Sequence, residues 1–126
     1  MAFSNILLID DDDDDQEIFL AAMKDISNTF TCTVAFSAQI AFQQLLAGEM
    51  IPDIIFLDLN MPIMNGKQFL SELKKNEALN MIPVIILSTS AHSATIQETK
   101  ELGARDFITK PASFKDFRNI LQSILD

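Results

Sequence analysis

Residues 54–58 read Ile-Ile-Phe-Leu-Asp, and this stretch decides the class of fold. Four apolar residues without polar alternation predict a short strand that is covered on both faces, as in a parallel sheet. Two further runs have the same character, from Ile6 to Ile9 and from Val84 to Leu87. Strands of this kind need helices above and below the sheet, so the chain is predicted to be an α/β protein.

Weaker strands and several helices complete the pattern. Thr31 to Phe36 and Phe107 to Thr109 are the further candidate strands, which makes five in all. Apolar residues between the strands recur at helical spacing. The predicted helical faces are Ile18, Phe19, Ala22, Met23 and Ile26; Ile40, Leu45 and Leu46; Phe69, Leu70 and Leu73; and Phe114, Phe117, Ile120, Leu121, Ile124 and Leu125. Strict alternation of strands and helices predicts a parallel, doubly wound sheet.

Polar residues and glycine mark where these helices should begin and end. Ser37 is expected to cap the helix that follows it. Ser113 and Asp116 have the spacing of a capping box at the start of the last helix. A more polar helix is predicted from Ser93 to Leu102, ended by Gly103.

Length and charge restrict the class of protein. The chain has 126 residues, of which 48% are apolar, so it has room for one domain with a real core, residues 1–126. Its 9 Lys and Arg oppose 18 Asp and Glu, for a formal charge of −9. This charge repels nucleic acids and anionic membranes, so neither is expected as a partner. No apolar run approaches the roughly 18 residues of a membrane span, and a cytoplasmic protein is expected.

Residue types that are rare in this chain exclude several kinds of site. Cys32 and His92 are the single cysteine and the single histidine, which excludes a disulfide framework and a Cys/His zinc site within one chain. The glycines Gly48, Gly66 and Gly103 lie too far apart for a dinucleotide fingerprint or a phosphate-binding P-loop. The chemistry must therefore come from carboxylates, hydroxyls and lysine.

Chemically active side chains stand where the predicted strands end. Asp10 and Asp11 follow the first strand, Asp58 closes the third, Ser88 closes the fourth and Lys110 follows the fifth. The carboxyl ends of parallel strands share one edge of the sheet, where ligands bind in such folds. Carboxylates gathered there repel one another and favour a hard cation such as Mg²⁺. A metal, an ammonium and a hydroxyl together suggest phosphoryl transfer.

The sequence resembles the receiver domain of two-component response regulators. The resemblance rests on four stretches in the same order and spacing as in that family: Ile6 to Asp11, Phe56 to Pro62 with Gly66, Pro83 to Ser88, and Gly103 to Pro111. It spans nearly the whole chain. It implies a flavodoxin-like fold with a five-stranded parallel sheet of order 2-1-3-4-5, and a single receiver domain over residues 1–126.

The resemblance also implies roles for the strand-end residues. Asp58 would accept a phosphoryl group from a phosphohistidine on a histidine kinase or phosphotransfer protein. Mg²⁺ would be bound by Asp11, by Asp58 and by the backbone carbonyl of Asn60, with Asp10 acting through water. Lys110 would pair with the phosphoryl oxygens. On this basis the chain is a phosphoacceptor signalling domain that promotes its own phosphorylation and dephosphorylation, and not an enzyme with a separate substrate.

A switch is implied in the same way. Ser88 would bind a phosphoryl oxygen, and Phe107 would follow its movement. The surface that changes would consist of the Ser93–Leu102 helix, the strand that carries Phe107 and the last helix, where a downstream protein would bind. The family also implies a cis peptide bond between Lys110 and Pro111, and Asn60 and Ser90 as residues that control access of water to Asp58.

The remaining acids of the aspartate run, the single histidine and the single cysteine are interpreted as having no role in the chemistry. Asp12 to Asp15 are interpreted as a solvated cluster at a helix N-terminus, where the helix dipole favours negative charge. His92 is interpreted as a loop residue and Cys32 as a small buried thiol.

Three alternatives to a stand-alone phosphoacceptor stay open. The chain could be a pseudo-receiver that keeps the fold and binds partners without phosphate, or a receiver taken from a hybrid kinase. A small Mg²⁺-dependent phosphatase is disfavoured, because Asn60 stands where such enzymes place a general acid and an amide cannot protonate a leaving group.

Overall fold

A five-stranded parallel sheet forms the centre of the molecule, in a computed structural model that describes residues 3–59, 61, 64–89, 92–111 and 113–125. The strand order is β2-β1-β3-β4-β5, and all neighbouring strands run parallel. The elements in chain order are β1 (Asn5–Ile9), α1 (Asp13–Ile26), β2 (Thr31–Ala35), α2 (Ala38–Leu46), β3 (Ile54–Asp58), α3 (Gly66–Lys75), β4 (Val84–Ser88), α4 (Ser93–Glu101), β5 (Asp106–Thr109) and α5 (Phe114–Leu125). The predicted fold class and strand order are confirmed.

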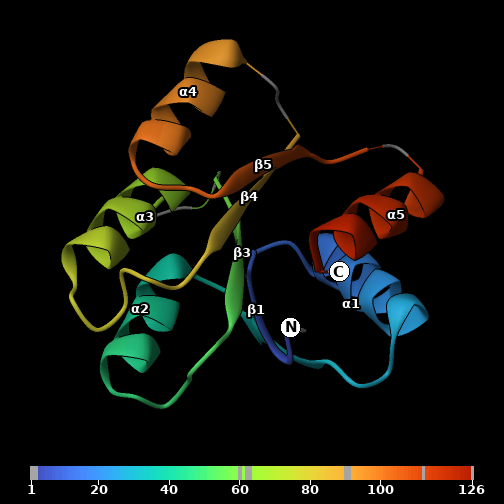
Figure 1. Cartoon of the computed structure of the whole chain (residues 1–126), viewed down its shortest axis with the longest axis horizontal. Coiled ribbons are helices and arrows are strands. Elements are labelled where there is room, and N and C mark those ends of the chain that lie inside the picture. The colour runs from blue at the N-terminus through green and yellow to red at the C-terminus, as the bar shows by residue number, and fades with distance from the viewer. Residues whose placement is uncertain (1–2, 60, 62–63, 90–91, 112, 126) are drawn as a thin grey trace.

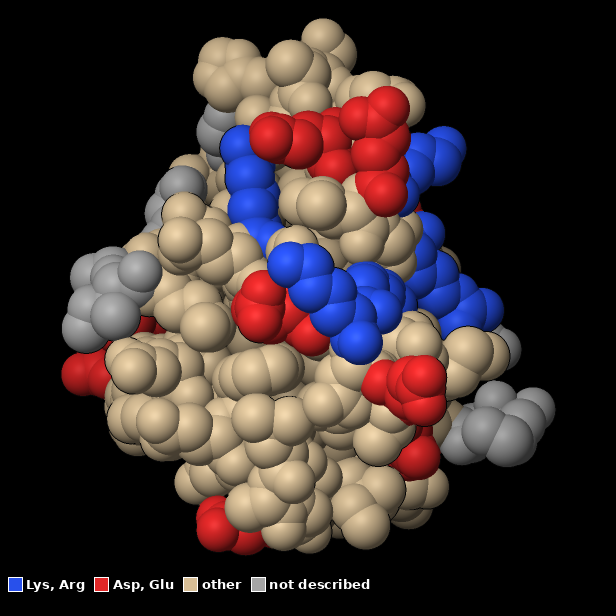
Figure 2. All heavy atoms as spheres, turned by 90° about the vertical axis from the view of Figure 1, so that its left-hand side faces the viewer, with Lys and Arg blue, Asp and Glu red and all other residues tan. Residues whose placement is uncertain are grey.

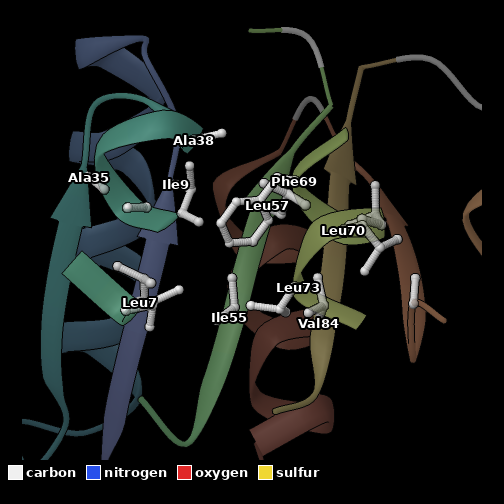
Figure 3. Packing of buried hydrophobic residues seen from close by; sticks show 14 of the residues in the cluster. Leu7, Ile9, Ala35, Ala38, Ile55, Leu57, Phe69, Leu70, Leu73 and Val84 are labelled. Carbon is white, nitrogen blue, oxygen red and sulfur yellow. The ribbon is translucent and has the colours of Figure 1, made fainter. Parts of the chain in front are cut away.

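Helices cover both faces of the sheet, as the unalternating strands require. α1 and α5 lie on one face, and α2, α3 and α4 lie on the other (Figure 1). Successive strand residues point to opposite faces. Leu7 and Ile55 therefore join the core under α2 and α3 (Figure 3), whereas Leu8 and Phe56 join the core under α1 and α5. Each central strand thus contributes to two separate cores.

Capping follows the predicted pattern in part. The Ser37 hydroxyl accepts the backbone N–H of Ile40 at 3.1 Å, as expected. The Ser113 hydroxyl accepts the N–H of Asp116 at 3.3 Å, which is the serine half of the predicted capping box. A reciprocal capping box that was not predicted opens α3, where Asn65 and Gln68 each accept the other's backbone N–H.

The predicted buried face of α2 is wrong at two of its three residues. Of its three expected residues, Leu45 is 3% exposed, but Ile40 is 50% and Leu46 is 53% exposed. The helix packs instead through Ala38, Ala41 and Leu45, which recur at the spacing of one helical face. Small alanines let the helix lie close to the sheet, and Ile40 and Leu46 point outward. Because α2 carries no charged residue, the part of the surface that it covers is largely uncharged (Figure 2).

Several smaller expectations are also corrected. Ile18 and Phe114 stand at the exposed margins of their helices instead of in the core. Cys32 is half-buried and not fully buried. The described residues contain no cis peptide bond, so the expected cis bond between Lys110 and Pro111 is wrong. Among the helices described, none has both the length and the apolar character needed to cross a membrane.

Two adjacent leucines test the packing of α2. Leu45→Ala should lower the free energy of unfolding by about 2–5 kcal/mol, because it leaves a cavity in the core. Leu46→Ala makes the same chemical change one residue along, on the exposed side, and should change it by no more than about 0.5 kcal/mol. Urea denaturation of both variants measures the difference. Equal losses would contradict the packing described for α2.

Candidate functional site

The predicted strand-end residues do meet at one edge of the sheet. Asp58 and Ser88 are the last residues of β3 and β4, and Asp10 and Lys110 directly follow β1 and β5. Parallel pairing brings these ends together, and β1 pairs with β3 so that Ile9 lies beside Leu57. The residues that follow this pair, Asp10 and Asp58, are consequently neighbours.

Three carboxylates form the acidic part of this edge. Asp10, Asp11 and Asp58 each offer an oxygen that lies within 4.8 Å of the other two. Asp10 is 1% exposed and Asp58 is 8% exposed, whereas Asp11 faces solvent. Hard oxygen donors at this separation suit a divalent cation such as Mg²⁺. Asn60, expected to add a backbone carbonyl, lies outside the described residues, as does Ser90.

Asp10 is held from three sides. One carboxylate oxygen accepts the N–H of Asp12 at 2.9 Å, and its backbone carbonyl accepts the Gln16 amide at 2.7 Å. Its own N–H donates to the carbonyl of Ala35 at 3.1 Å. Burial raises the pKa of Asp10 above its ordinary value, although the N–H of Asp12 and the charge of Lys110 act against this. The buried Gln16, which the sequence did not single out, thus ties α1 to the end of β1.

Lys110 directly follows the edge strand β5 and lies beside the acidic residues. Its backbone N–H donates to the carbonyl of Ser88 at 2.7 Å, and its ammonium contacts Asp15 at 2.8 Å and Asp10 at 3.2 Å. Burial lowers the pKa of Lys110, but the hydrogen bond that its ammonium donates to Asp15 and the charges of Asp10, Asp58 and Asp15 outweigh this effect and raise the pKa. The side chain therefore stays charged at neutral pH.

The interpretation of Asp12 to Asp15 is correct for some of these acids and wrong for Asp15. Asp12 caps α1 by accepting the N–H of Asp15 at 2.9 Å, and Asp13 and Asp14 face solvent. Asp15 instead pairs with Lys110. The sequence places Asp15 on the inner face of its helix, because Asp15 precedes the core residue Phe19 by four positions, but it does not indicate the partner.

Ser88 and Phe107, the two residues of the expected switch, lie on neighbouring strands. Ser88 is buried, and Phe107 is half-buried against the core under α2 and α3. Ser88 pairs with Thr109, and Ile86 pairs with Phe107. Residues two apart on a strand share a face, so the side chains of Ser88 and Phe107 point to the same side of the sheet.

The sequence matches the response regulator receiver domain family over residues 6–122. The chain belongs to this family. Receiver domains are signalling modules of two-component systems, and phosphorylation and Mg²⁺ binding at an acidic pocket are general features of them. Histidine kinases and downstream targets are their general partners.

Similar proteins include both sequences and solved structures. This receiver domain is 37% identical over 73 residues to response regulator Rcp1 from Synechocystis, covering 58% of this chain and 50% of that protein. It is 48% identical over 80 residues to a protein-glutamate methylesterase/protein-glutamine glutaminase from Treponema denticola, covering 62% of this chain and 20% of that protein. The match thus spans half or less of the length of both relatives.

Two solved response regulators share the whole fold. The phosphorylated cyanobacterial phytochrome response regulator RcpA superposes with a TM-score of 0.88 at 29% identity, covering 98% of this chain and 91% of that chain. A Mn²⁺-bound form of response regulator Rcp1 gives 0.80 at 29% identity, covering 96% and 91%. These likenesses agree with the fold and the acidic edge described above.

Metal binding at the carboxylates should be measurable as stabilisation. Mg²⁺ at about a hundred times its dissociation constant should raise the free energy of unfolding by about 2.7 kcal/mol, because the folded state alone holds the carboxylates together. Asp11→Asn should lose most of this gain. Asp14→Asn removes the same charge from an exposed neighbour outside the cluster and should keep it. Thermal unfolding with and without Mg²⁺ measures the effect, and equal behaviour of the two variants would contradict the assigned cluster.

Proposed function

We propose that this receiver domain accepts a phosphoryl group on Asp58 from a phosphohistidine of a histidine kinase or phosphotransfer protein. The observation that carries the proposal is the position of Asp58, a nearly buried carboxylate at the end of β3, clustered with Asp10 and Asp11. The positive charge of Lys110 interacts with the negative charge of Asp58. An ionised carboxylate in such a setting is a nucleophile suited to phosphorus.

The proposed transfer exchanges one bond for another. An oxygen of Asp58 attacks the phosphorus, and the bond between phosphorus and the imidazole nitrogen of the donor breaks. The electron pair of that bond stays on the imidazole, and Asp58 becomes an acyl phosphate. Water later attacks the phosphorus, which releases inorganic phosphate and restores the carboxylate. Bound Mg²⁺ would neutralise charge on the carboxylates and on the phosphoryl oxygens.

The surrounding residues stabilise the charge that spreads over the phosphoryl oxygens in the transition state. The ammonium of Lys110 and the hydroxyl of Ser88 are assigned to two of these oxygens. Asp11, Asp58 and the backbone carbonyl of Asn60 are the proposed metal ligands, and Asp10 acts through a water molecule. The cluster of Asp10, Asp11 and Asp58 within 4.8 Å supports this assignment.

The proposed output is a contact with a downstream protein on the surface of α4, β5 and α5. Ser88 and Phe107 point to the same side of the sheet from neighbouring strands, which supports a coupled movement in which Phe107 follows an inward shift of Ser88. We propose that residues 1–126 act as one receiver domain, a phosphoacceptor with no separate substrate. A cytoplasmic location fits a chain with a single cysteine and no disulfide.

Phosphorylation of Asp58 is tested by intact mass after incubation with acetyl phosphate. The wild type should gain one phosphoryl group with Mg²⁺ and none with a chelator, because the carboxylates and the donor repel each other without the metal. Hydroxylamine should remove the adduct, as expected for an acyl phosphate and not for a serine ester. Asp58→Asn should show no adduct, and the exposed Asp14→Asn should behave as wild type. A folded wild type without any adduct would favour a phosphate-independent pseudo-receiver.

The link between the site and the output surface is tested at Lys110. In the wild type, phosphorylation should shift the amide resonances of Phe107 and of α4. Lys110→Ala should form the adduct with a much smaller shift, because no ammonium draws the site together around the phosphoryl group. Lys115→Ala, at an exposed lysine of α5, is the matched control. Undiminished shifts in Lys110→Ala would contradict the assigned role.

A further inference from the structure

The ammonium of Lys110 is shared between two carboxylates with different surroundings. Asp10 belongs to the cluster that contains Asp58, and its oxygen lies 3.2 Å from the ammonium. Asp15 lies outside that cluster, in the first turn of α1, and its oxygen lies nearer, at 2.8 Å. Lys110 is thus held between the metal-binding carboxylates and a separate acid on a helix.

The place of Asp15 is set by the backbone. Its N–H donates to the carboxylate of Asp12 at 2.9 Å, and the next residue, Gln16, donates its side-chain amide to the carbonyl of Asp10. These bonds tie the first turn of α1 to the end of β1. The carboxylate of Asp15 is therefore presented to Lys110 by a rigid turn, while the Lys110 side chain is only 15% exposed.

We propose that Asp15 is a positioning residue that holds Lys110 in competition with the phosphoryl group on Asp58. This inference rests on the proposed function. When a phosphoryl group is present on Asp58, its oxygens attract the ammonium, and Lys110 exchanges its contact with Asp15 for one with the phosphoryl group. The free energy of the Lys110–Asp15 pair opposes that exchange, so Asp15 lowers the affinity of the site for a phosphoryl group and biases the domain toward its resting state.

The competition is measured with trifluoroberyllate, a non-covalent mimic of a phosphoryl group on a carboxylate. The chain has no Trp or Tyr, so calorimetry in the presence of Mg²⁺ is the suitable readout. Asp15→Asn should bind the mimic roughly two- to fivefold more tightly than the matched control, the range for a partly exposed ion pair. The control is Asp14→Asn, which removes the same charge from the same turn at an exposed position.

Two further variants separate positioning from a structural effect. Asp15→Glu keeps the charge and should return the affinity toward the wild-type value. In a Lys110→Ala background, Asp15→Asn should bind the mimic with the same affinity as Asp14→Asn. The reason is that the ammonium for which Asp15 and the mimic compete is then absent. Should Asp15→Asn fail to fold, Asp15→Ser takes its place in both comparisons.

The outcomes distinguish this inference from the proposed function. Equal affinities of Asp15→Asn and Asp14→Asn, or a difference that persists without Lys110, would overturn the role of Asp15 and leave phosphorylation of Asp58 untouched. A wild type that gains no phosphoryl group on Asp58 and binds no mimic would overturn both. Tighter binding in Asp15→Asn that depends on Lys110 supports the proposal.

Discussion

Parallel pairing of β1 with β3 is the constraint on which the site depends. Ile9 lies beside Leu57 in that register, so the acids that follow the two apolar runs become neighbours. The pairing is itself required by hydrophobic burial, because both strands lie in the middle of the sheet with a core on each face. The carboxylates are therefore brought together by the packing of residues that take no part in the chemistry.

Bringing these carboxylates together costs electrostatic free energy, and a neighbouring side chain offsets part of that cost. Carboxylates a few ångströms apart repel by about 4 kcal/mol per pair at the effective dielectric of a protein surface. Burial adds to the cost for Asp10, whose pKa is raised. Lys110 offsets part of it by its contacts with Asp10 and Asp15. A site built in this way favours a cation, and it is compatible with the exchange of Lys110 that we propose.

Much of the fold could be predicted because strands buried on both faces leave an unambiguous pattern, as in residues 54–57 and 84–87. The juxtaposition of Asp10, Asp58, Ser88 and Lys110 followed from topology alone. Helical faces were less predictable. Ala38 and Ala41 bury little area each, so their pattern was masked by the larger Ile40 and Leu46, which the tertiary structure leaves exposed.

Residue types and their spacing were enough to predict the alternation of strands and helices, the acids and lysine at the strand ends, and the family of the chain. Each of these depends on residue types and on their order and spacing along the chain, which the sequence contains in full. Two contacts became evident only in the folded chain: Lys110 contacts Asp15, a residue 95 positions away, and Gln16 donates a hydrogen bond to the backbone carbonyl of Asp10. The contact of Lys110 with Asp15 depends on how β5 packs near α1, and residue spacing within a segment carries no information about the distance between two elements so far apart in the chain. The bond from Gln16 depends on how α1 is placed against the end of β1.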